Sequence, residues 1–216
     1  MPDLTHLALY VAAAFVLAVT PGPGIFYVAA RTLAGGRAEG MASSFGTGLG
    51  GTVHVLAGSL GVSAIVLASA ELFAALKLIG AAYLVWLGLR AFQSARRDAS
   101  AVLNGGSAAT PIGARRAFHE GVLVEALNPK TAAFFLAFVP QFVEPAHGQV
   151  ALQFVVLGFV SVALNTLADI AVAFAASGIR EGAATRPALI RRLREASGAA
   201  MMALGLGLAL AKRPAT

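Results

Sequence analysis

The sequence predicts an all-α integral membrane protein of six transmembrane helices, arranged as a 3+3 inverted repeat with the first helix of each half broken by proline. Three observations predict it: long apolar runs without charge, proline breaks inside two of them, and arginines gathered in alternate loops. Of its 216 residues 58% are hydrophobic and 12% are charged, with a mean hydropathy of +0.78. A soluble domain carries about twice that charged fraction.

Composition also narrows the class of partner. The net charge of +6 would suit nucleic acid, but the basic residues lie between apolar runs, as the cytoplasmic loops of membrane proteins do. We therefore expect the lipid bilayer as surroundings and no nucleic-acid partner. The chain has no cysteine, so it has neither disulfides nor thiolate metal ligands. The first apolar run is too long for a signal-peptide core and is expected to be retained.

Six apolar segments account for the spans. They are predicted at about 4–30, 41–70, 72–91, 121–143, 149–177 and 196–211. Residues 1–95 then form the first three-helix repeat, 96–116 a central cytoplasmic loop and 117–216 the second repeat.

Arginines set the orientation. They follow the first, third and fifth spans, which places those loops in the cytoplasm and both termini outside. If the first run is instead re-entrant, five full spans remain and the N-terminus lies inside. Loop charge leaves these two topologies open, because no Lys or Arg precedes the first run.

Two prolines, Pro21 and Pro129, interrupt the first helix of each half. Thr20 and Asn128 precede them, and such capping side chains before a proline are typical of a new helix start. A half-helix that begins at membrane depth points its N–H groups and positive dipole end at an anion. We expect the carboxylate of a transported solute there. The alternative is a kink that only shapes packing.

Polar residues inside the spans are candidates for function, because ionisable groups at membrane depth are costly. Asp169 shares one helical face with Gly158, Ser161 and Asn165. Its carboxylate could bind a solute ammonium or take a coupling proton, and a structural ion pair with Lys77 or Lys130 is the alternative.

Three further side chains are weighed in the same way. His54 continues a small-residue stripe and either takes a proton or hydrogen-bonds between helices. Lys130 follows a helix start and either attracts a carboxylate or pairs with Glu125. The candidate solute-binding residues are Thr20, Pro21, Gly22, Pro23, Gly24, Asn128, Pro129, Lys130, Asn165 and Asp169. The candidates for proton coupling are Asp169, Glu125 and His54; no catalytic residue or metal ligand is expected.

The motifs resemble a known family. Residues 17–23, Leu-Ala-Val-Thr-Pro-Gly-Pro, are similar to the opening motif of the LysE/RhtB amino-acid exporters. Asn-Pro-Lys at 128–130, the Phe-rich run 134–138 and Pro-Gln-Phe-Val at 140–143 resemble its second motif, and residues 77–90 resemble its third-span pattern. Two residues depart from the pattern: Gly24 stands where Asp or Asn is frequent, and Glu125 stands where Asn is frequent.

The resemblance implies a multi-pass protein of the bacterial cytoplasmic membrane that exports amino acids or close derivatives, driven by the proton-motive force, without a cofactor. The alternative within this superfold is divalent-cation export, which the lack of clustered soft or carboxylate ligands disfavours. No motif of a membrane enzyme is present, so we expect no catalysis. Which amino acid is moved, the coupling ion and a homo-oligomeric state stay open.

Overall fold

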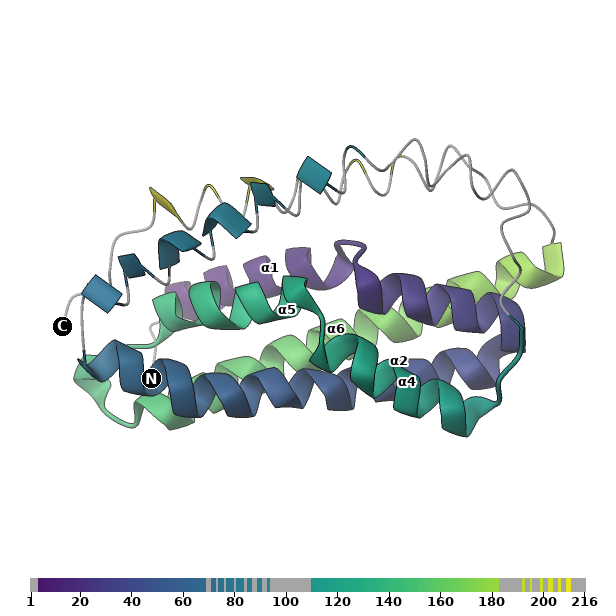
Figure 1. The fold of residues 1–216 in the computed structure, drawn as a ribbon, viewed down its shortest axis with the longest axis horizontal. Helices are drawn as coiled ribbons and strands as arrows, with labels where there is room; N and C mark the ends of the chain where they lie inside the picture. Colours follow the sequence, from purple (N-terminus) through teal and green to yellow (C-terminus); the bar gives the residue numbers. More distant parts are fainter. Residues whose placement is uncertain are drawn as a thin grey trace.

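The computed structural model describes residues 4–68 and 110–182, with isolated residues and short runs between 71 and 93 and between 192 and 210. Every element in these residues is helical (Figure 1). In chain order they are α1 Leu4–Val19, α2 Pro23–Ala68, α4 Ala114–Ala126, α5 Pro129–Ala133, η1 Phe134–Phe138, η2 Val139–Phe142, η3 Pro145–His147 and α6 Val150–Gly182. The predicted spans 72–91 and 196–211 are described only in part, and most of the predicted loop 96–116 lies outside the described residues.

The first predicted break is confirmed. The helix ends at Val19 and restarts at Pro23, and the two parts meet at an angle of 46°. Thr20 turns back on the end of α1: its backbone N–H and its hydroxyl both donate to the carbonyl of Val16, at 3.1 and 2.6 Å. Local hydrogen bonds of this kind end a helix while keeping its last polar groups satisfied.

A tight turn at Gly36 replaces the loop that the sequence predicted between the first two spans. Gly36 has φ 79° and ψ −168°, and helical structure continues on both sides of it. Only glycine adopts this backbone conformation without strain, which explains why so short a reversal is possible. In Figure 1, α2 runs to the right-hand end, turns there and returns alongside the other helices.

The second predicted break is confirmed as well. α4 ends at Ala126, α5 begins at Pro129, and the two directions differ by 40°. After α5 the helix widens to a π-helical segment (η1) and then tightens to a 3-10 segment (η2). α4 starts at Ala114, inside the predicted central loop 96–116, and carries an Arg116–Glu120 pair on its exposed face.

The number of spans is only partly reproduced. Within the described residues, α6 is long and apolar enough to cross a membrane by itself, over Val150–Gly178. The two bent helix pairs, α1 with α2 and α4 with the segment from Pro129 to Phe142, pass the same test only when each pair is taken together.

The helices pack through small residues. A Cβ atom added to Gly46 would lie 2.2 Å from the carbonyl oxygen of Phe118, and one added to Gly50 would lie 2.4 Å from that of Val122. The small-residue stripe of α2, which is Gly46, Gly50, His54 and Gly58, therefore brings its backbone against that of α4. The predicted inward face of α6 is also confirmed, since Ser161 and Asp169 are only 4% and 5% exposed.

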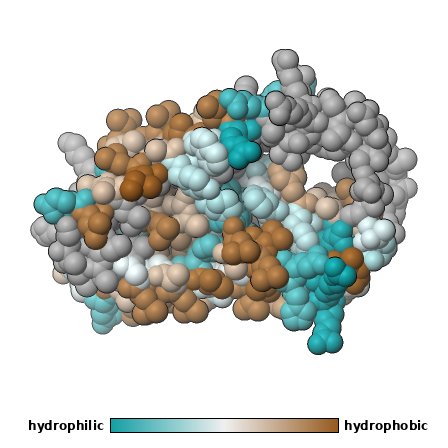
Figure 2. All heavy atoms as spheres, in the orientation of Figure 1, coloured by the Kyte–Doolittle hydropathy of each residue, from teal (hydrophilic) through white to brown (hydrophobic). Residues whose placement is uncertain are grey.

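The exterior is apolar. Large hydrophobic side chains stand exposed along α1, α2, α4 and α6, and brown hydrophobic surface covers much of the face in Figure 2. Leu60 and Leu127 are 77% and 79% exposed, which would be costly in water. This surface is what a lipid-facing helix presents.

Candidate functional site

At the first proline break, a side chain from the second break donates hydrogen bonds to the carbonyls that end α1. Pro21 has no N–H, so the carbonyl of Leu17, four residues earlier, lacks its i+4 helical donor and keeps a 3.2 Å bond from the backbone N–H of Thr20. The ammonium of Lys130 takes that place: Nζ lies 3.1 Å from the oxygen of Leu17 and 2.9 Å from that of Thr20. Lys130 is 4% exposed. Its charge thus rests on the carbonyl end of α1, where the helix dipole is negative.

The second break is completed in the same manner by a side chain from α2. Pro129 leaves the carbonyl of Glu125 without its helical donor. His54 Nε2 lies 2.8 Å from that oxygen and must donate, since a carbonyl only accepts. The backbone N–H of Asn128 also donates to it, at 3.0 Å. Each proline break is therefore closed by a cationic or titratable side chain from a distant part of the chain.

The carboxylate of Glu125 is held on both oxygens. Asn128 Nδ2 donates to Oε2 at 2.8 Å, and Thr131 Oγ1 donates to Oε1 at 2.6 Å. The side-chain oxygen of Asn128 also accepts from the backbone N–H of Lys130 at 3.0 Å, which caps α5. Glu125, 5% exposed, is thus fixed in one orientation by the turn that follows it.

Two glycines at the first break make room for these charges. A Cβ added to Gly24 would lie 2.7 Å from Glu125 Oε2, and one added to Gly22 would lie 3.1 Å from Lys130 Cε. Gly24 stands in the first turn of α2, where N–H groups and the helix dipole favour a negative charge. The carboxylate of Glu125 therefore lies against this helix start.

A small polar cavity lies beside Glu125. It is lined by Thr47, Gly48, Gly51, Glu125, Thr131, Phe135, Val162, Asn165 and Asp169, from α2, α4, α5, η1 and α6. Its volume is about 10 Å³, which is room for about one water molecule. Thr47 Oγ1 donates to Asp169 Oδ2 at 2.7 Å across the wall. A larger solute fits only if these helices separate.

The structure brings many of the predicted residues together around the breaks, though in different roles. Glu125, Asn165 and Asp169 line the cavity, whereas Lys130 and His54 bind backbone carbonyls beside it. Between the described side chains, no ion pair within 4.0 Å joins Lys130 to Glu125 or Asp169. Thr20 bonds within its own helix, and Pro21 and Pro23 shape the bend.

Sequence reasoning missed two hydroxyls of this site. Thr47 and Thr131 each donate to a buried carboxylate, at 2.7 and 2.6 Å. A signal for Thr131 was available, because it follows Lys130 directly in the proline-broken segment. Thr47 lies next to the glycine stripe and had no pattern of its own.

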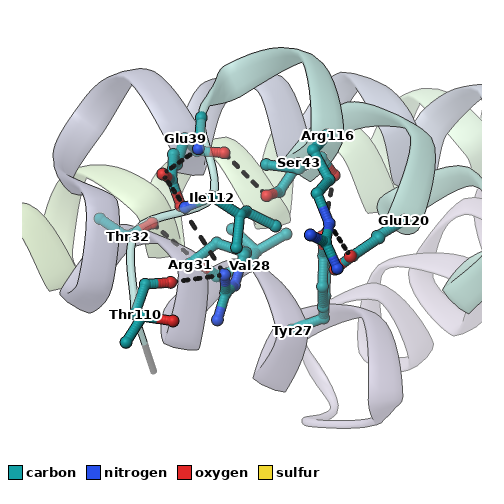
Figure 3. Close-up of polar contacts among 12 residues, drawn as sticks. Tyr27, Val28, Arg31, Thr32, Glu39, Ser43, Thr110, Ile112, Arg116 and Glu120 are labelled. Carbon is teal, nitrogen blue, oxygen red and sulfur yellow. Dashed lines mark hydrogen bonds and ion pairs between the residues drawn. The ribbon is translucent and has the colours of Figure 1, made fainter. Parts of the chain in front are cut away.

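A second polar cluster joins α2 to α4 at the end that carries Arg31, Arg37, Arg115 and Arg116, which we name the basic end (Figure 3). Glu39, 3% exposed, accepts the backbone N–H groups of Ile112 and Gly113 on Oε1, at 2.8 and 2.7 Å. Gly113 offers no side-chain cap, so Glu39 caps α4 from another helix.

Other contacts reinforce this cluster. Arg31 Nη1 donates to the carbonyl of Thr110 at 3.1 Å and lies 3.9 Å from Glu39 Oε2. The hydroxyl of Tyr27 donates to the carbonyl of Ala117 at 2.9 Å and lies 3.3 Å from Glu120 Oε2. Together they hold α4 against the turn of α2 at the basic end.

Comparison with known proteins agrees with these features. The family model for the LysE type translocator matches residues 15–212. An uncharacterized membrane protein of Pseudomonas aeruginosa is 32% identical over 98% of both chains. A homoserine/homoserine lactone efflux protein of Salmonella typhimurium is 28% identical over 94% of this chain and 95% of its own. A leucine efflux protein of an Enterobacter species is 27% identical over 68% of each.

No solved structure is significantly similar to the chain. The family match spans both proline breaks, the cavity and the basic end, and its members are membrane translocators. The expected resemblance and the expected bacterial membrane location are confirmed by these relatives. The chain belongs to the LysE type translocator family.

Proposed function

We propose that the protein is a secondary transporter that exports amino acids or close derivatives across the bacterial cytoplasmic membrane. The observation that carries the proposal is the cavity beside the second proline break, which joins Glu125 and Asp169 inside an apolar helical protein. Ionisable groups at this depth are typical of transport sites. The efflux relatives support the direction of transport.

The proposed architecture keeps the 3+3 inverted repeat, with residues 1–95 and 117–216 as its halves and the central loop 96–116 in the cytoplasm. The similar bends of 46° and 40° support equivalent roles for the two breaks. The arginines support a cytoplasmic location for the basic end. Solute would then reach the cavity from the cytoplasm only after the contacts of Glu39, Arg31 and Tyr27 with α4 open.

Proton coupling follows from the charges near the cavity. Two carboxylates, Glu125 and Asp169, accompany one ammonium, that of Lys130, so one more positive charge would neutralise the site. Either a proton or the ammonium of the solute supplies it. Because both would bind the same carboxylates, arrival of one favours departure of the other. This competition produces exchange of a proton for an amino acid.

Everted membrane vesicles with an acidic interior test the proposal. The panel is the twenty radiolabelled amino acids with homoserine added. Vesicles that contain the protein should accumulate at least one of them above vesicles without it, and a protonophore should abolish the accumulation. If no compound accumulates, the proposed function is wrong. If accumulation persists after the proton gradient is dissipated, proton coupling is wrong.

The divalent-cation alternative gains no supporting observation. Across the residues that the structure describes, no group of three or more His, Cys, Asp or Glu side chains is placed to hold a metal ion. Two carboxylates without further oxygen-rich ligands are fewer than hard cations usually take.

A further inference from the structure

The charged groups that line the cavity are both carboxylates. Glu125 and Asp169 face it together with the polar side chains of Thr47, Thr131 and Asn165. No Lys, Arg or His belongs to the lining formed by the described residues. A solute carboxylate placed in this cavity would meet like charges, whereas an ammonium would meet two opposite ones.

The groups expected to attract a solute carboxylate are paired within the protein. Glu125 occupies the start of α2 beside Gly24, and Asn128 caps the start of α5. The ammonium of Lys130 donates to the carbonyls that end α1. Recruiting Asn128 or Lys130 to a carboxylate would leave a buried partner without its hydrogen bond, which costs about 1–3 kcal/mol per group. At the start of α2, a solute carboxylate would meet the like charge of Glu125 beside Gly24.

The polar atoms of the cavity that make no hydrogen bond within the described residues are suited to bind a hydrogen-bond donor of the solute. Thr47 uses one oxygen of Asp169, and no hydrogen bond reaches the other oxygen from any described residue. The side-chain amide of Asn165 likewise makes no hydrogen bond with the described part of the chain. Asp169 is 5% exposed and lines the cavity, so its second oxygen is an acceptor available there. An ammonium has three N–H donors and no acceptor, which matches this set.

We propose that the site recognises its solute through the ammonium group alone, with Asp169 and Glu125 as the charge partners and Asn165 as a neutral one. The substrate class then includes amino acids whose carboxyl group is neutral, as an amide, ester or lactone, as well as the free acids. Compounds whose amine is acylated lie outside it. This inference rests on the proposed export function and names the chemical group that the site selects.

Two matched series test it in everted vesicles with an acidic interior. One is L-leucine, L-leucinamide and N-acetyl-L-leucine. The other is L-homoserine, L-homoserine lactone and N-acetyl-L-homoserine. Accumulation is measured relative to vesicles without the protein, which subtracts passive diffusion. In at least one series, we expect the carboxyl-neutral compound to accumulate within about threefold of the free acid, and the N-acetyl compound to stay at background.

The outcomes separate the two claims. Accumulation of the free acid alone, in whichever series is active, overturns this inference and leaves the export function intact. Accumulation of an N-acetyl compound overturns it as well. If no compound of either series accumulates, and the full panel also fails, the export function and the inference fall together. The Asp169→Asn variant should lose the free acid and the carboxyl-neutral compound in parallel, whereas loss of the free acid alone contradicts the shared ammonium contact.

Discussion

The Nζ atom of Lys130 lies 3.1 Å from the carbonyl oxygen of Leu17, the acceptor that Pro21 deprives of its helical donor. The equivalent oxygen at the other break, that of Glu125, is met by His54 at 2.8 Å. In a bilayer no water replaces a missing backbone donor, so each break needs such a partner. Both partners come from other helices, and each therefore ties its broken helix to the rest of the bundle.

Replacing Lys130 by Met should destabilise the protein. The variant removes the Lys130 donor from the buried carbonyls of Leu17 and Thr20. The carbonyl of Leu17 keeps a 3.2 Å bond from the backbone N–H of Thr20, so the cost comes mainly from the carbonyl of Thr20 and is about 1–3 kcal/mol. Lys130→Arg is the matched control, because it keeps the charge and the donors. We expect the thermal midpoint in detergent to fall clearly for Met and much less for Arg. Equal midpoints for Met and wild type would contradict the role given to Lys130.

His54 and Pro129 should be energetically coupled. His54→Leu removes a donor from the carbonyl of Glu125, whereas Pro129→Ala restores a backbone N–H that can serve the same oxygen. His54→Leu should therefore lower the free energy of unfolding by about 1 kcal/mol less in the Pro129→Ala background than in the wild-type protein. Unfolding free energies of the four proteins measure this coupling. Strictly additive costs would show that the two donors do not share an acceptor.

The space beside Gly24 should accept one carboxylate, from position 24 or from position 125, but not two. Gly24→Asp alone brings a second carboxylate against Glu125 Oε2, which lies 2.7 Å from the position of the added Cβ. We expect that variant to lose export. Adding Glu125→Asn removes the collision and leaves one carboxylate in the same space, so the double variant should regain a measurable share of the rate. Initial rates in everted vesicles decide it, with Glu125→Asn alone as the control.

A double variant no better than Gly24→Asp, at equal expression and thermal midpoint, would contradict this relation. Better export by Gly24→Asp alone would contradict it too, since it would mean that the two carboxylates do not compete for one position.

Glu39→Ala should weaken the basic end. It leaves the N–H groups of Ile112 and Gly113 without their shared acceptor, and bonds to a charged group are worth about 1.5–3 kcal/mol each. Glu39→Gln keeps an acceptor oxygen and should lose less. Accessibility of a cysteine introduced at Ala117 to a membrane-impermeant thiol reagent, added from the cytoplasmic face, should rise for Ala. Unchanged labelling and an unchanged midpoint would mean that Glu39 does not hold α4.

The breaks were predictable, whereas their partners were not. A capping residue before proline predicted both breaks, and the helix start at Pro129 with Asn128 as its cap is confirmed. The first start was predicted at Pro21 and lies at Pro23, because the hydroxyl of Thr20 bonds back to the carbonyl of Val16 and does not cap α2. The pairing of Lys130 with the carbonyls of Leu17 and Thr20 depends on how two distant segments cross, which local pattern does not encode.

The reversal at Gly36 shows a second limit. The sequence predicted a loop between the first two spans, and the structure makes the reversal with one residue at positive φ. The adjacent Gly35 fits the same turn, since its missing side chain leaves space for Glu39. Glu39 lies between the first two predicted spans, and the approach of α4 makes it a cap.

The measurement that tests the account most directly is the initial rate of amino-acid accumulation by the Asp169→Asn variant. Asparagine keeps the shape and an acceptor for Thr47 but removes the charge that faces the cavity. We predict a rate at the background of vesicles without the protein, for every compound that wild type accumulates, with the thermal midpoint preserved. Export at the wild-type rate by this folded variant would contradict the account.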